Sequence, residues 1–319
     1  MIKLKHAENS GEGVNKMKIG LTNRKEIINI LGLEKGLQTI KKAGFDAVDF
    51  KVGDYFDDEN HPLNKASEDE FLSFFHNIKR ICDDLELEIS QTHGASLVCV
   101  PDSGLTERIN RRVELDIKAT AALGVKYCVF HSVRKQDWEF ISTAPEFLHS
   151  KNAEFFQNVV SPVCGKYDVN FAMETHGLTI MSTGAEADFI GDAYVLKENF
   201  DMIKSDYKAF CLDTGHINEI VRLGTPTVPE TVKILGKDIK VLHLHDNEGY
   251  NDSHLPPLIY GKRNINWHET FDALDEIGFD GVYNFELLLA RYGTHLEECI
   301  SFLGKFLREF TEERGRMGK

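Results

Sequence analysis

Eight short runs of apolar and β-branched residues recur along the chain with a nearly constant spacing. Their starts lie about 30 to 43 residues apart, which leaves room for one strand, one helix and two loops in each interval. The runs are KIGLT (18–22), AVDF (47–50), EISQTH (88–93), YCVFH (127–131), NFAMETH (170–176), AFCLDTGH (209–216), VLHLHDN (241–247) and YNFEL (283–287). This alternation predicts a parallel sheet whose crossovers are helices.

Helix signals occupy the intervals between these runs. Ser67 and Glu70 have the spacing of a capping box ahead of an apolar stripe. Gly44 and Gly124 each precede a strand-like run by a few residues, where a glycine suits the left-handed end of a helix. A doubly wound sheet would need a glycine-rich phosphate loop, and the sequence contains neither GxGxxG nor GxxxxGK[ST]. We therefore predict the α/β class and one (β/α)8 TIM barrel rather than two smaller domains.

Composition bounds the domain organisation and the partners. Residues 1–16 are polar and are interpreted as a disordered extension or an upstream start, with a single barrel domain over 17–319. The 37 basic and 51 acidic residues give a net charge of −14, which argues against a general electrostatic grip on nucleic acid. No apolar run is long enough to cross a bilayer. Six scattered cysteines without a CxxC pair predict reduced thiols in a cytoplasmic protein.

Polar side chains stand where the predicted strands end. In a barrel these ends meet at one mouth, so residues far apart in the sequence converge there. They are His93, His131, Glu174, Asp213, His216, His243 and Glu286. Any one such histidine is more often a hydrogen-bonded core residue than a metal ligand. Several carboxylates together, however, would repel each other without a cation, and the mixed oxygen and nitrogen donors suit Mn²⁺, Zn²⁺, Co²⁺ or Mg²⁺ better than Ca²⁺. A divalent metal ion is the predicted cofactor.

The motifs METH, LDTGH, HLHDN, DSHLPPLIYG and NFEL, in this order, resemble those of the xylose-isomerase-like TIM-barrel superfamily. That superfamily includes sugar and sugar-phosphate isomerases and epimerases, and also the endonuclease IV enzymes of DNA repair. The resemblance implies one metal ion held by Glu174, Asp213, His243 and Glu286, with Glu174 and Glu286 as the catalytic proton carriers. In the endonuclease branch further ligands complete a three-zinc site. Candidates for these ligands, or for substrate contacts, are His93, His131, His216, Asp252 and His254.

The loops that follow the strands discriminate between the two branches. Only SVRKQDWEF is appreciably basic, whereas VGDYFDDENHPLNK is acidic, so a small-molecule carbohydrate is a better expected partner than nucleic acid or a membrane. A homo-oligomer is compatible with the sequence. We predict a metal-dependent sugar or sugar-phosphate isomerase or epimerase that transfers a proton through a metal-stabilised enediolate. The alternatives are a zinc-dependent phosphodiesterase of the endonuclease IV type and a barrel that binds a ligand without catalysis.

Five further residues are assigned supporting or structural positions. His176 and Asp246 are expected in a second layer behind the metal ligands, with Asp246 orienting His243 or His216. Lys262 and Arg263 are candidates to bind a substrate phosphate or carboxylate, although a solvated pair of loop charges is the more common reading of such residues. His245 is expected to face away from the mouth and to serve packing alone.

Overall fold

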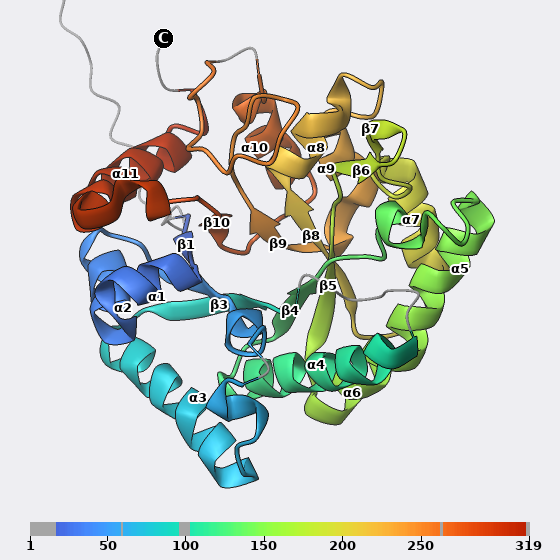
Figure 1. Ribbon diagram of the computed structural model, residues 1–319. Helices are drawn as coiled ribbons and strands as arrows, with labels where there is room; N and C mark the ends of the chain where they lie inside the picture. The colour runs from blue at the N-terminus through green and yellow to red at the C-terminus, as the bar shows by residue number, and fades with distance from the viewer. Residues whose placement is uncertain (1–16, 59, 96–102, 262–263, 317–319) are drawn as a thin grey trace, which may run out of the picture.

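A ring of parallel strands wrapped by helices forms the protein (Figure 1). The computed structural model describes residues 17–58, 60–95, 103–261 and 264–316. Eight strands run in the order β10-β1-β2-β3-β4-β5-β8-β9, and a bridge between Leu244 and Phe285 brings the two ends of this order together. They are β1 Ile19–Asn23, β2 Ala47–Phe50, β3 Glu88–His93, β4 Tyr127–Phe130, β5 Asn170–Glu174, β8 Lys208–Asp213, β9 Ile239–His243 and β10 Tyr283–Phe285. The predicted (β/α)8 TIM barrel is confirmed.

The helices lie outside the ring and begin and end at local signals in the sequence. They are α1 Lys25–Leu31, α2 Leu33–Lys42, α3 Glu68–Asp84, α4 Ser103–Ala122, α5 Pro145–Phe155, α6 Ser161–Tyr167, α7 Ala193–Met202, α8 Thr214–Val221, α9 Val228–Leu235, α10 Trp267–Glu276 and α11 Leu296–Glu312. At the start of α3 the Ser67 N–H donates to Glu70 Oε2 at 2.8 Å, and the Glu70 N–H donates to Ser67 Oγ at 3.3 Å. Gly44 and Gly124, just beyond α2 and α4, have φ values of 96° and 70°, which L side chains rarely adopt.

One element departs from the predicted pattern. After β5 the chain forms an antiparallel hairpin of β6 Leu178–Met181 and β7 Gly184–Ala187 before α7 begins. The repeating pattern of the sequence predicted only a loop and a helix after this strand. The predicted leader 1–16 lies outside the described residues. None of the described helices has the length and apolarity that a membrane span requires.

The barrel interior is filled by small side chains directly below the mouth. Because side chains alternate along a strand, residues two positions apart face the same way. Each small residue lies two positions before one of the strand-end polar residues, and together they form a compact buried cluster. Its members include Val129, Ala172, Cys211 and Val241. A mostly apolar layer therefore forms the floor of the polar mouth, with Gln91, two positions before His93, as a buried polar member. The cysteines within the described part of the chain are free thiols, as expected from their scattered positions.

Candidate metal centre

Four side chains from four strands meet at the mouth of the barrel. Glu174 ends β5, Asp213 ends β8, His243 ends β9, and Glu286 follows β10 directly. Each offers one ligand atom, these atoms all lie within 4.8 Å of one another, and all four residues are buried. His243 Nδ1 lies 2.6 Å from Glu174 Oε1 and 3.3 Å from Glu286 Oε2. The residues that the resemblance assigned to one metal ion thus share one small space.

The charges of this group fit a divalent cation. Burial alone would raise the pKa of the Glu174 carboxyl, but the neighbouring His131 and His243 hold that pKa well below its usual range. Burial likewise opposes ionisation of Glu286, yet its pKa is also held well below the usual range by neighbouring positive groups. Glu174 Oε2 is buried and accepts no aligned hydrogen bond from the described residues. Buried carboxylates and an imidazole at such spacing are a donor set for Zn²⁺ or Mn²⁺.

Asp49 on β2 fixes the orientation of the His243 ring. Its Oδ2 lies 2.9 Å from His243 Nε2 and accepts a hydrogen bond from Thr22 Oγ1 at 3.2 Å. When Nδ1 binds a metal ion, the one proton of the ring is on Nε2, where the Asp49 carboxylate accepts it, and this arrangement is typical of a metal-bound histidine. Asp49 was not among the site residues predicted from the sequence. A fully buried carboxylate inside the apolar run AVDF was the signal that could have revealed it.

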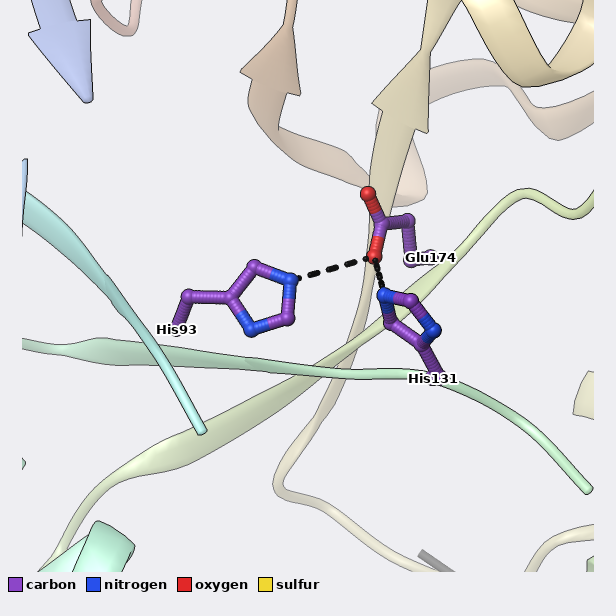
Figure 2. A group of neighbouring side chains, drawn as sticks. All are labelled: His93, His131 and Glu174. Carbon is purple, nitrogen blue, oxygen red and sulfur yellow. Dashed lines mark ion pairs between the residues drawn. The ribbon is translucent and has the colours of Figure 1, made fainter. Parts of the chain in front are cut away.

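A second group shares Glu174 with the first. His131 Nε2 lies 2.8 Å from Glu174 Oε2, and His93 Nε2 lies 3.4 Å from the same oxygen. Figure 2 shows the two rings approaching this oxygen from different strands, with the other carboxylate oxygen turned away. The ligand atoms of the three residues meet the same 4.8 Å limit. The predicted additional ligands His93 and His131 are therefore placed beside the central group.

A third group lies on the other side of Asp213, around Asp252. His254 Nε2 is 3.0 Å from Asp252 Oδ2, and His216 Nε2 is 3.6 Å from the same oxygen. Burial lowers the pKa of His216, but the charges of Asp213 and Asp252 outweigh it and raise that pKa well above the usual range. Asp252 and His254 come from the loop after β9, so the structure joins a loop pair to the strand-end residues.

The expectation that His245 faces away from the mouth is wrong. Its Nε2 lies 3.0 Å from Asp213 Oδ1 and 3.7 Å from Asp252 Oδ1, and its ring stacks on His254 at 4.1 Å. Residues two apart in an extended chain share a face, so His245 follows His243 toward the mouth. Gly215 makes room for it, because a Cβ at that position would overlap the His245 ring. His245 thus joins Asp252 and His254 as a candidate ligand group.

Three of these histidines have a protonation pattern set by backbone carbonyls. The Nδ1 atoms of His93, His216 and His254 each lie 2.9 Å from a carbonyl oxygen, those of Gly94, Thr175 and Glu286 respectively. A carbonyl only accepts, so in each ring Nδ1 carries the proton and donates it. Because Nδ1 is the protonated atom, Nε2 is the atom of each ring that can bind a metal ion. Metal ligands are commonly held in this way by a carbonyl behind the ring.

The predicted second-layer residues occupy different positions. His176 Nε2 accepts the Ser132 N–H at 3.1 Å, and its ring lies edge-on to His131 at 5.8 Å, so it does lie behind a candidate ligand. Among the described residues, Asp246 instead contacts Asn247, Leu258 and Asn264, and it shapes the following loop rather than orienting His243 or His216. Lys262 and Arg263 lie outside the described residues.

Two cationic side chains that were not predicted from the sequence lie beside Glu286. Arg24 follows β1 and Lys51 follows β2, the two strands that come next to β10 in the ring. Arg24 Nη1 lies 3.6 Å and Lys51 Nζ 3.5 Å from Glu286 Oε1. They supply positive charge to the part of the mouth that lies above β1 and β2. In the sequence each is an ordinary basic residue after a strand, with nothing to separate it from a solvated charge.

Comparison with known proteins defines the family. Residues 37–300 match the model of the xylose isomerase-like TIM barrel. The chain belongs to this family. A curated relative, an uncharacterized protein MJ1311 from Methanocaldococcus jannaschii, is 39% identical over 116 residues, which span 36% of this chain and 38% of the relative. The match therefore covers well under half of that relative.

Solved structures of similar fold include several sugar epimerases. A D-psicose 3-epimerase in the presence of D-fructose matches with a TM-score of 0.65 at 13% identity, over 94% of this chain and 99% of that one. A D-tagatose 3-epimerase-like protein matches at 0.64 and 22% identity, over 92% and 100%. The IOLI protein with a binding zinc atom matches at 0.70 and 18% identity, over 94% and 100%. At these sequence identities, the structural similarity shows that this chain and the matched proteins have the same barrel fold.

Proposed function

We propose that this protein is a divalent-metal-dependent isomerase or epimerase of a small sugar or sugar phosphate. The observation that carries the proposal is the buried meeting of Glu174, Asp213, His243 and Glu286 at the mouth of the barrel. Support comes from the family membership and from the sugar epimerases among the similar structures. A divalent ion held by these four residues would polarise a substrate carbonyl and stabilise negative charge on the enediolate.

The two glutamates are suited to move the proton. They come from β5 and β10, which are separated around the ring by β8 and β9, so they can reach a bound substrate from different sides. Both have a pKa held well below the usual range and are therefore ionised near neutral pH, the protonation state from which a general base must start. The apolar floor of Val129, Ala172 and Val241 keeps bulk water away from below.

Exchange of a carbon-bound hydrogen with solvent tests this proposal. Metal-loaded protein is incubated in D₂O with a panel of ketoses, aldoses and their phosphates, and deuterium uptake is followed by NMR. We expect uptake with at least one sugar, and its loss in both Glu174→Gln and Glu286→Gln. Glu88→Gln is the matched control, because Glu88 is an exposed glutamate at the opposite end of its strand, paired with Lys18. Undiminished uptake in both active-site variants would contradict the assigned roles.

A second candidate function is metal-dependent hydrolysis of a phosphodiester. The specific observation in its favour is the pair of flanking groups, His93 with His131 and His245 with Asp252 and His254, which provide places for further ions. Multinuclear metal sites are common in enzymes that cleave phosphate esters. The net charge of −14 disfavours a nucleic acid substrate. Cleavage of abasic-site DNA by zinc-loaded protein, with no deuterium uptake on any sugar, would favour this candidate over the first.

A further inference from the structure

Arg24 and Lys51, here called the Arg24–Lys51 pair, form a cationic corner of the mouth. Their side chains are largely buried, with 18% and 14% of their surfaces exposed, yet they still reach solvent. Both point at the same oxygen, Oε1 of Glu286. Two like charges held this close repel each other, and Glu286 offers the same oxygen to both, while Asp54 and Glu174 add attraction for Lys51.

The hydrogen-bonding capacity of the pair is unused within the described residues. The separations of 3.5 and 3.6 Å from Glu286 Oε1 exceed an ordinary N–H···O hydrogen bond, and no side-chain hydrogen bond from Arg24 or Lys51 to a described residue is formed. Arg24 Nη1 is fully buried and donates no hydrogen bond to any residue that the structure describes. A guanidinium has five N–H donors and an ammonium has three, and leaving buried charged donors unsatisfied is costly. A ligand with several acceptor oxygens would relieve that cost.

Charge neutralisation alone does not explain the pair. To neutralise the charge of the Glu286 carboxylate, the two cations need only lie near it. Neutralisation therefore leaves their N–H donors without acceptors. A planar guanidinium matches a phosphate or carboxylate with two parallel hydrogen bonds, and the ammonium adds a third contact.

We propose that the Arg24–Lys51 pair binds the oxyanion of the substrate, a phosphate or carboxylate group on a short polyol. This assignment rests on the proposed sugar chemistry and narrows the substrate class to sugar phosphates and sugar acids. Because both cations adjoin a candidate metal ligand, the oxyanion lies within a few carbon atoms of the reacting carbon. A neutral sugar leaves the donors of the pair unpaired and binds more weakly.

Calorimetric titration of the metal-loaded protein tests the assignment without requiring turnover. Inorganic phosphate, gluconate and neutral sorbitol are titrated into the wild type, Arg24→Gln, Lys51→Met and the control Lys25→Met, whose side chain is exposed next to Arg24. We expect at least one of the two anions to bind, with affinity reduced about tenfold or more in each pair variant, as for the loss of one charge-assisted contact. Sorbitol binding and the Lys25→Met titrations remain at wild-type values.

Each outcome decides between supporting and overturning the assignment. Selective loss for phosphate indicates a sugar phosphate, and selective loss for gluconate indicates a sugar acid. Arg24→Lys, which keeps the charge, should retain part of the affinity and guards against loss through misfolding. Unchanged anion affinity in Arg24→Gln and Lys51→Met, or failure of the wild type to bind either anion at millimolar concentration, overturns the proposal. Pair-dependent anion binding without deuterium uptake on any sugar would reject the sugar chemistry alone.

Discussion

Removing the Asp49 carboxylate should weaken metal binding without abolishing the fold. Asp49 Oδ2 lies 2.9 Å from His243 Nε2, where it can accept a proton from the ring and hold Nδ1 toward the three carboxylates. A hydrogen bond to a charged partner contributes about 1.5 to 3 kcal/mol, and each 1.4 kcal/mol corresponds to about tenfold in affinity. Asp49→Ala should therefore lower Zn²⁺ or Mn²⁺ affinity by about ten- to a hundredfold, the range usual for residues behind a metal ligand.

A graded series makes this prediction sharp. Asp49→Asn keeps an acceptor oxygen but loses the charge, so its affinity should fall between those of the wild type and Asp49→Ala. Thr22→Val removes the hydroxyl that contacts Asp49 at 3.2 Å and accepts from Asn284 Nδ2 at 3.1 Å, and it should have a much smaller effect on metal affinity. Affinities are measured by competition with a chromogenic chelator, and circular dichroism checks the fold. Wild-type affinity in a folded Asp49→Ala protein would refute the reasoning, as would an equal loss in Thr22→Val.

Three further predictions concern stability. Chelation of the metal ion should lower the melting temperature, because an ion at a hundred times its Kd stabilises the fold by about 2.7 kcal/mol. In Asp213→Asn the chelated and the metal-loaded protein should have the same melting temperature. Burial raises the pKa of Asp116 to about 7, so the folded state holds its proton more tightly than the unfolded state, and stability falls as pH rises from about 4 to 7. Asp116→Asn still has an acceptor for the Ala95 N–H but lacks this titration. Its free energy of unfolding relative to that of the wild type, measured with denaturant, should therefore be about 2 to 3 kcal/mol more favourable at pH 8 than at pH 5. An identical pH dependence in both proteins would contradict the assignment. Gly215→Ala should cost about 1 to 3 kcal/mol, since its Cβ overlaps His245, and the double variant with His245→Ala should recover part of that loss.

The fold was predictable because its signals are local and repeated. Each strand is a short apolar run, and helix starts such as Ser67 with Glu70 carry their own caps. Parallel strands in a ring place their carboxyl ends together, so Glu174 and Asp213 could be brought to one mouth from the sequence. The hairpin of β6 and β7 escaped prediction because the GAEA segment of β7 has no β-branched or large apolar residue and none of its residues is buried.

The parts of the site that the sequence did not reveal depend on contacts between distant segments. Asp49 faces His243 across the barrel, 194 positions away in the chain. Arg24 and Lys51 look like ordinary loop charges until β1, β2 and β10 are placed side by side. Asp246 stands beside the ligand strand in sequence, but its carboxylate turns to the loop that begins after it. The sequence thus indicated that Asp246 lies beside the ligand strand, but it did not indicate which residues its carboxylate contacts.

Metal analysis of the equilibrated protein tests the central claim most directly. After dialysis against Zn²⁺ or Mn²⁺ and removal of free ion, elemental analysis should find at least one tightly bound ion per chain in the wild type. His243→Ala should lose that ion, whereas His268→Ala, which replaces a surface histidine paired with Asp272, should keep it. Full metal content and unchanged affinity in His243→Ala, or no retained ion in the wild type, would contradict a metal centre at the mouth of the barrel.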